Sequence, residues 1–153
     1  MLKQLFTVSV FISVVLAGSI SAEEKTEQIK GPILITSQTL LSDDKARTAL
    51  FEGSVVAKTE NMTLYSDKML VYYAEGTGNV TKIVAEGSVK LVKKDLVVTS
   101  KVANYFADEE KIIFTGEPKA IQKGDIITGT KMTYFMKDDR SFVENSRVLL
   151  ENK

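Results

Sequence analysis

The chain has 153 residues, with 20 basic and 20 acidic side chains and a net charge of zero. This balance lacks the basic surface that nucleic acids require and the cationic cluster that holds a protein to anionic lipid heads. Cysteine and histidine are both absent, which excludes disulfides and removes the common zinc ligands and the most frequent general base. The composition therefore predicts no nucleic-acid partner, no metal site and no cofactor.

The first 22 residues have the three-part pattern of a secretory signal peptide. A basic residue near the start is followed by an apolar run at residues 5–16 and by small residues that lead to Ala22. The apolar run is short for a membrane span of about 20 residues. We therefore expect cleavage after Ala22, with Ser19 as the second choice, and an uncleaved membrane anchor is the alternative.

A polar leader is predicted at residues 23–32, and the folded domain is predicted to cover residues 33–153. Within this domain a pattern of small and apolar residues occurs four times. Each unit has a small starting residue and a closing residue, and each closing residue precedes the next starting residue by 13 positions. Such a fixed spacing indicates a repeat architecture. The starting residues are Ser37, Ser66, Ser100 and Gly129, and the closing residues are Gly53, Gly87, Gly116 and Asn145.

Each unit is predicted to be a β-hairpin, because Val, Ile, Thr, Tyr and Phe dominate it and favour strands. Mostly apolar residues stand two positions before and three and five positions after each starting residue. A strand alternates with a period of two, so these positions share one face only if a bulge or corner follows the starting residue. Glycine or asparagine at the closing position predicts a positive φ angle there. Polar turns such as residues 93–95 follow the return strands, the five extra residues of the second unit fall at residues 75–79, and no helix is expected.

Three pairs of acidic residues could be read as the facing carboxylates of a glycosidase. Each pair, however, stands six to ten residues after a starting residue, where the hairpin turn falls, and aspartate favours turns for backbone reasons. The spaced acidic loop that binds calcium is also missing. We therefore expect turns, and the chain is predicted not to be an enzyme. The pairs are Asp43–Asp44, Glu109–Glu110 and Asp138–Asp139.

Three segments carry a resemblance to a known family. They are Pro-Ile-x-Ile-x-Ser at residues 32–37, Phe-x-Gly-x-Val at 51–55 and Ser-Asp-Lys-x-x-Val-Tyr-Tyr at 66–73. Together with the signal peptide and the repeat, they resemble the OstA-like repeat of LptA-type lipopolysaccharide-transport proteins. The family favours Asp directly after the starting residue, and this chain keeps it only at Asp67. Asn145 replaces the last glycine.

The resemblance implies a twisted, open β-jelly-roll that is V-shaped in section and is built from four repeated hairpin units. It also implies a periplasmic protein that shields the acyl chains of lipopolysaccharide in an apolar groove and passes the lipid from an inner-membrane transporter to an outer-membrane translocon. The implied partners are lipopolysaccharide, an LptC-like component, an LptD-like translocon and further copies of the chain. Copies would join edge to edge, because both end strands are predicted to be bare.

The repeat positions also predict which side chains line the inner, lipid-binding face, with Asn104 and Thr133 pointing outward. The predicted inner-face residues are Ile33, Ile35, Leu64, Met69, Val71, Val98, Tyr105, Phe114, Ile127, Met132 and Tyr134.

Other interpretations of the sequence stay open at this point. An uncleaved segment at residues 5–16 would favour an LptC-like, membrane-anchored component of the same pathway. The N-terminal domain of an LptD-like translocon is a further relative, although no barrel sequence follows Lys153. A purely structural β module with a closed, dry core would bind no lipid. An enzyme acting on saccharides would depend on acids such as Glu110 or Asp138.

Overall fold

The computed structural model describes residues 31–151, and over this range the chain forms twelve β-strands and no helix. The prediction of an all-β fold is therefore confirmed for the described part of the chain. Within the same residues, no helix is long and apolar enough to cross a membrane. The predicted signal peptide and most of the polar leader lie outside the described residues.

The strands are named in chain order. They are β1 (Leu34–Thr36), β2 (Thr39–Asp43), β3 (Thr48–Lys58), β4 (Thr63–Tyr73), β5 (Val80–Lys93), β6 (Leu96–Phe106), β7 (Lys111–Thr115), β8 (Lys119–Gln122), β9 (Asp125–Thr128), β10 (Lys131–Phe135), β11 (Arg140–Glu144) and β12 (Arg147–Leu149).

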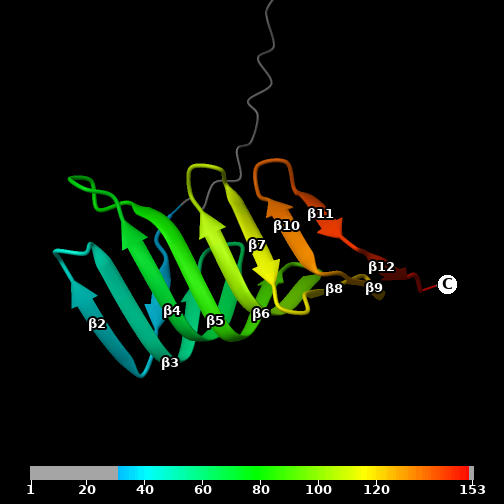
Figure 1. The fold of residues 1–153 in the computed structure, drawn as a ribbon, viewed down its shortest axis with the longest axis horizontal. Coiled ribbons are helices and arrows are strands. Elements are labelled where there is room, and N and C mark those ends of the chain that lie inside the picture. The colour runs from blue at the N-terminus through cyan, green and yellow to red at the C-terminus, as the bar shows by residue number, and fades with distance from the viewer. Residues whose placement is uncertain (1–30, 152–153) are drawn as a thin grey trace, which may run out of the picture.

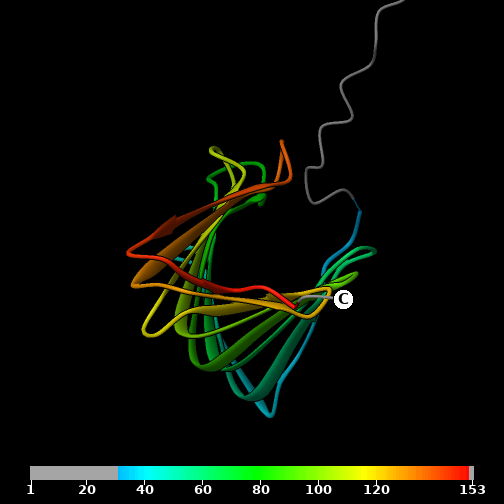
Figure 2. The same cartoon turned by 90° about the vertical axis from the view of Figure 1, so that its right-hand side faces the viewer.

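All twelve strands belong to one antiparallel sheet that bends across its middle (Figure 1). The long strands β3 to β6 cross the bend, so each contributes one half to either side. We call one side arm A, which adds β2, β7, β10 and β11 to these halves, and the other side arm B, which adds β1, β8, β9 and β12. Figure 2, viewed along the length of the sheet, shows the two arms meeting along one side and separating on the other.

The bend lies where the sequence predicts a bulge. The pairing of β3 with β4, of β4 with β5 and of β5 with β6 shifts in register at this point. The closing glycines have φ angles between 77° and 83°, and Asn145 has a φ of 49°, as predicted. Three residues that follow the glycines also have positive φ, which the pattern did not predict. They are Ser54, Ser88 and Glu117.

One contact at the bend explains the four-fold repeat. In each unit the residue after the starting residue lies over the closing residue of the same unit. A Cβ added to Gly87 would stand 2.9 Å from the Cβ of Asp67, and at Gly116 the corresponding distance to the Cβ of Lys101 is 2.5 Å. Since these contacts involve Cβ atoms, side chains other than Asp serve equally well after the starting residue. In the last unit the Asn145 side chain instead donates a hydrogen bond to Thr130 Oγ1 at 2.9 Å.

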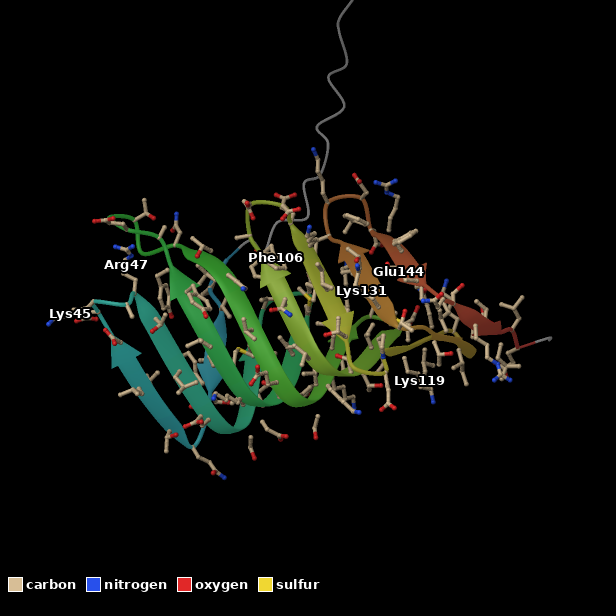
Figure 3. All side chains as sticks on the ribbon, viewed as in Figure 1. Lys45, Arg47, Phe106, Lys119, Lys131 and Glu144 are labelled. Carbon is tan, nitrogen blue, oxygen red and sulfur yellow. The ribbon has the colours of Figure 1, made fainter. Side chains whose placement is uncertain are left out.

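The outer face of arm A combines an aliphatic row, which includes Leu50, Leu70 and Ile113, with polar and aromatic side chains. Figure 3 shows Phe106 near the end of β6, and its ring has the ammonium groups of Lys82 and Lys111 at 5.4 Å and 5.5 Å from its centre. Further along, Lys131 and Glu144 form an ion pair of 2.6 Å between β10 and β11 (Figure 3). Such cross-strand pairs stabilise a sheet face that meets water.

Thr133 occupies this outer face but is not exposed there. Its neighbours in the register are Ile113 on β7 and Phe142 on β11. Only 7% of Thr133 is exposed, although it points away from the interior as predicted. An outward direction therefore does not by itself give access to solvent on this arm.

Candidate functional site

The interior between the two arms is the main candidate site, and all eleven predicted inner-face residues lie in it. The best buried are Met69 and Val71, both 0% exposed, and Phe114, which is 1% exposed. Six of the eleven belong to the buried core and five pack against it. The six are Met69, Val71, Val98, Phe114, Met132 and Tyr134, and the five are Ile33, Ile35, Leu64, Tyr105 and Ile127.

The apolar interior forms rows that run across the whole sheet. In arm A one row leads by strand pairing from Leu40 on β2 through Met69 and Phe114 to Val143 on β11. In arm B a matching row leads from Ile35 on β1 to Val148 on β12. Both rows reach the two ends of the sheet, so the apolar interior between the arms is continuous from end to end, and we call this interior the trough.

The sequence-based list took only Phe114 from the return strands, although these strands supply much of the core. Phe51 pairs with Met69, and Ile83 pairs with both Val71 and Tyr105, so each missed residue stands beside a predicted one. The signal was present, because apolar residues alternate on both sides of each closing glycine. Ten buried residues of the return strands are absent from the list, namely Ala49, Phe51, Val55, Ala57, Ile83, Ala85, Val89, Leu91, Ile112 and Ala120. Ala103 on β6 and Met136 after β10 are buried and absent from it as well.

The middle of the trough is filled by the protein's own side chains. Between the arms, Leu64 and Leu91 of arm B face Ile83 and Ile112 of arm A across a gap of about 40 Å³. Ligand pockets usually measure about 300 to 1,000 Å³, so this gap is too small to hold an acyl chain as it stands. The arms meet here through apolar side-chain contacts, whereas backbone pairing joins them only at the bend.

Two larger openings lie at the borders of the trough. One, of about 450 Å³, is at the β2 end and is lined by Leu40, Phe51 and Tyr73 among others. The second, also about 450 Å³, lies at the mouth between the arms, where Ile33 and Tyr105 contribute to its wall. The β2 end and part of the mouth are thus accessible, and Val148 at the other end of the arm B row is 51% exposed.

A polar cluster crosses the mouth between β5 of arm B and β10 of arm A. The Lys93 ammonium donates to the Tyr134 hydroxyl at 2.5 Å and lies 3.3 Å from Asp139 Oδ1. The Tyr134 hydroxyl in turn donates to Asp139 Oδ1 at 2.5 Å. We call these three residues the mouth cluster. Sequence reasoning placed Lys93 in a polar turn, whereas it ends β5 and is buried.

The mouth cluster alters the acidity of its members. Burial, reinforced by the hydrogen bond to Asp139, raises the pKa of Tyr134 to about 12. The hydrogen bond from Tyr134, together with that from Lys93, lowers the pKa of Asp139. Lys93 therefore has an ionised carboxylate beside it at neutral pH, which offsets the cost of burying its charge.

The end strands of the sheet have one neighbour each in the described part of the chain, so the predicted bare edges are confirmed there. β1 and β2 pair only with β3, β11 pairs only with β10, and β12 pairs only with β9. Large apolar side chains are exposed at both ends. At one end Leu40 and Leu41 are 59% and 66% exposed, and at the other Phe142 and Leu149 are 59% and 65% exposed.

The acidic pairs lie at hairpin ends, as predicted. Asp43 Oδ1 accepts a hydrogen bond from the backbone nitrogen of Ala46 at 2.9 Å, and Asp138 pairs with Arg140 at 2.8 Å. Glu109 forms an ion pair with Lys111. Over residues 31–151, no group of three or more acidic, histidine or cysteine side chains is arranged to hold a metal ion.

A single bent antiparallel sheet with an apolar interior between two arms defines an open β-jelly-roll. The family model described as "LptA/(LptD N-terminal domain) LPS transport protein" matches residues 34–140. The chain therefore belongs to this family of lipopolysaccharide transport proteins, and the resemblance seen in the sequence is confirmed.

Solved structures show the same fold. One of them is the crystal structure of LptH from Pseudomonas aeruginosa, described as the LptA homologous periplasmic component of the lipopolysaccharide transport device. It matches with a TM-score of 0.73 and 16% sequence identity, over 84% of this chain and 99% of that chain. Among curated protein sequences, none matches this chain.

Proposed function

We propose that this chain is a periplasmic lipopolysaccharide-binding protein. It shields the acyl chains of the lipid in the trough and passes the lipid from an inner-membrane transporter toward an outer-membrane translocon. The observation that carries this proposal is the pair of apolar rows that reach both ends of the sheet, from Leu40 to Val143 and from Ile35 to Val148. An apolar path that continues to both ends suits a cargo that enters at one end and leaves at the other.

The mechanism is shielding rather than chemistry. Each methylene group taken out of water contributes about 0.8 kcal/mol, so a few acyl chains supply ample affinity without any charged contact. Because the gap between Leu64 and Ile112 measures about 40 Å³, the arms have to move apart to admit a chain. This movement leaves the backbone pairing intact, since the arms share strands only at the bend. The energy for directed transport comes from another component.

The bare ends of the sheet are the proposed sites of assembly. Exposed strand edges recruit further strands, and two different edges that meet head to tail build an open filament. Leu40 and Leu41 at one end and Phe142 and Leu149 at the other would be covered in such a contact. We propose that one edge meets an LptC-like component, that the other meets an LptD-like translocon, and that copies of the chain join between them. The signal peptide would direct export and be cleaved after Ala22.

A lock across the mouth tests whether the arms open around the lipid. The chain contains no cysteine, so introduced thiols are the only ones present. Cysteines at Lys94 and Asp138, in turns of opposite arms, would be joined with a short bifunctional maleimide, and lipopolysaccharide binding would be measured with purified protein.

We expect the joined protein to lose binding and the same variant carrying a monofunctional maleimide to keep it. Equal binding by both forms would contradict the opening of the arms. Absence of binding by the unmodified wild-type protein would favour the closed structural module instead.

A further inference from the structure

Among the residues that the structure describes, Lys93 is the buried basic side chain, and it lies in the mostly apolar trough. Lys93 is the last residue of β5, and only 8% of its side chain is exposed. In arm B it pairs with Leu96, whereas Tyr134 in arm A pairs with Ile112. Its ammonium group, 5.1 Å from the centre of the Tyr134 ring, therefore reaches across the mouth to the opposite arm.

The charged partner of Lys93 is placed differently. Asp139 lies in the turn of residues 136–139, and 70% of its side chain is exposed. Asp139 Oδ1 supplies a negative charge next to the buried ammonium group, and such a partner offsets the cost of its burial. Because ion pairs with exposed groups contribute little to stability, the exposed Asp139 carboxylate is bound only weakly to the ammonium. The buried cation is the fixed half of the pair, and the anion is the exchangeable half.

We propose that Lys93 and Tyr134 form a recognition site for the anionic head group of an amphiphile whose acyl chains lie in the trough. The ammonium and the hydroxyl both donate to Asp139 Oδ1 now, and both can donate to an oxygen of a phosphate, sulfate or carboxylate head. The head group takes the place of Asp139 when the chains enter between the arms. This proposal rests on the proposed function, because the apolar tail needs the trough.

The position of the site fits this role. Tyr134 belongs to the inner face and stands at the rim of arm A, one residue before the end of β10. A chain in the trough would leave its head at the mouth, close to the ammonium of Lys93. The mouth cluster thus selects amphiphiles by the charge of the head, whereas the trough accepts any apolar tail.

Isothermal titration calorimetry with three probes tests the proposal. The probes are monododecyl phosphate, the neutral dodecyl maltoside and inorganic phosphate, with both amphiphiles below their micelle concentrations. The variants are Lys93→Met, which keeps an apolar stem, and Asp139→Asn, which removes the competing carboxylate. Lys90→Met is the matched control, because Lys90 lies on the same strand and is exposed, with its ammonium 5.9 Å from the Tyr65 ring.

We expect Lys93→Met to weaken the binding of monododecyl phosphate about tenfold, the effect of losing one hydrogen bond to a charged group. Binding of dodecyl maltoside should stay unchanged, which also shows that the variant is folded. Asp139→Asn should strengthen binding of the phosphate amphiphile, and Lys90→Met should alter neither. Opposite signs for Lys93→Met and Asp139→Asn would separate recognition from a structural role, which would weaken binding in both variants.

Three results would overturn the proposal. One is equal loss of both amphiphiles in Lys93→Met, and another is tight binding of inorganic phosphate alone, which would indicate a site for the free anion. The third is wild-type protein that binds dodecyl maltoside as tightly as monododecyl phosphate, because binding would then not depend on the charge of the head group. If neither amphiphile binds the wild-type protein, the proposed function fails together with this inference.

Discussion

The centre and the ends of the sheet have the same repeat and the same kinds of residue, but they differ sharply in burial. Along a single apolar row of arm A, Leu40 at the end is 59% exposed, whereas Met69 and Phe114 at the centre are 0% and 1% exposed. The central strands have a neighbour on each side, and the end strands have one. Burial in this fold is therefore set by the next strand rather than by residue type, as in other repeat architectures.

This difference has a consequence for assembly. Every residue of β2 and of β12 is exposed, so neither strand has its apolar side chains covered within the molecule. A further strand at either end would give these residues the surroundings that the central ones already have. The ends are thus the part of the fold that leaves apolar side chains in water, and the centre is the part that holds the fold together.

The largest predicted effect on stability comes from truncating apolar residues of the same row at the centre and at the end of the sheet. Phe114→Ala should lower the free energy of unfolding by about 3 to 5 kcal/mol, because it removes a fully buried ring and leaves a cavity. Leu40→Ala, in the same row, should lower it by less than about 1 kcal/mol, since the side chain is already largely in water. Urea unfolding measures both values. Similar losses in the two variants would show that burial along the row does not decide stability.

Substituting glycines at the bend and at a loop tip should have a smaller effect on the free energy of unfolding. Gly87 and Gly76 have similar φ angles, 79° and 76°, but only at Gly87 would an added Cβ meet another atom, the Asp67 side chain. Gly87→Ala should cost about 3 kcal/mol, from left-handed strain and overpacking together, and Gly76→Ala about 1 kcal/mol from strain alone. Thermal unfolding of both variants would reveal the difference. Equal losses of stability in the two variants would show that the close contact with Asp67 at the bend does not explain why a glycine recurs there.

The mouth cluster, on the side of the trough opposite the bend, predicts that the free energy of unfolding depends on pH. The pKa of Tyr134 is raised to about 12, so the folded protein keeps this proton after the unfolded chain has lost it above its ordinary pKa near 10. The free energy of unfolding should therefore fall as the pH rises from 10 to 12. Tyr134→Phe should lack this part of the decline, as measured by urea unfolding at each pH. A decline of equal size in the variant would mean that other groups cause it.

The lowered pKa of Asp139 predicts a second loss of stability, this time at acidic pH. Its contribution to stability is present above the ordinary pKa of an aspartate and is lost as the pH falls through the lowered value. Asp139→Asn should remove this acid-dependent loss and make the alkaline one smaller, because burial alone then raises the pKa of Tyr134. If the free energy of unfolding of this variant falls at acidic pH as it does in the wild-type protein, the contact of Asp139 with Tyr134 and Lys93 would be contradicted.

The smallest effect on stability is expected at the ends. Leu149 is 65% exposed, so Leu149→Ser should change the free energy of unfolding by no more than about 0.5 kcal/mol. The same substitution should weaken self-association, which sedimentation velocity measures over a range of concentrations. Lys119→Ser, on the outer face of β8, is the control. Unchanged association in Leu149→Ser would argue against the end strands as the contact.

Local periodicity made the bend and its glycines predictable from sequence. The spacing from Ser66 to Gly87 and the change of alternation after Ser66 predict a corner, and the register shifts there. The burial of Lys93 could not be predicted in this way, because its partners Tyr134 and Asp139 belong to the opposite arm. Strand periodicity indicates which face a side chain occupies, and it carries no information about which residues meet across the trough.

The most direct test of the central claim is site-specific photo-crosslinking to lipopolysaccharide in cells, with neighbouring residues as controls. Val98 and Tyr105 point into the trough, and Thr99 and Asn104 stand next to them on the outer face. A crosslinker at each of the four positions should give lipopolysaccharide adducts at Val98 and Tyr105 and none at Thr99 and Asn104. Equal adducts at all four positions, or none at the two inner positions in folded protein, would contradict transport through the trough.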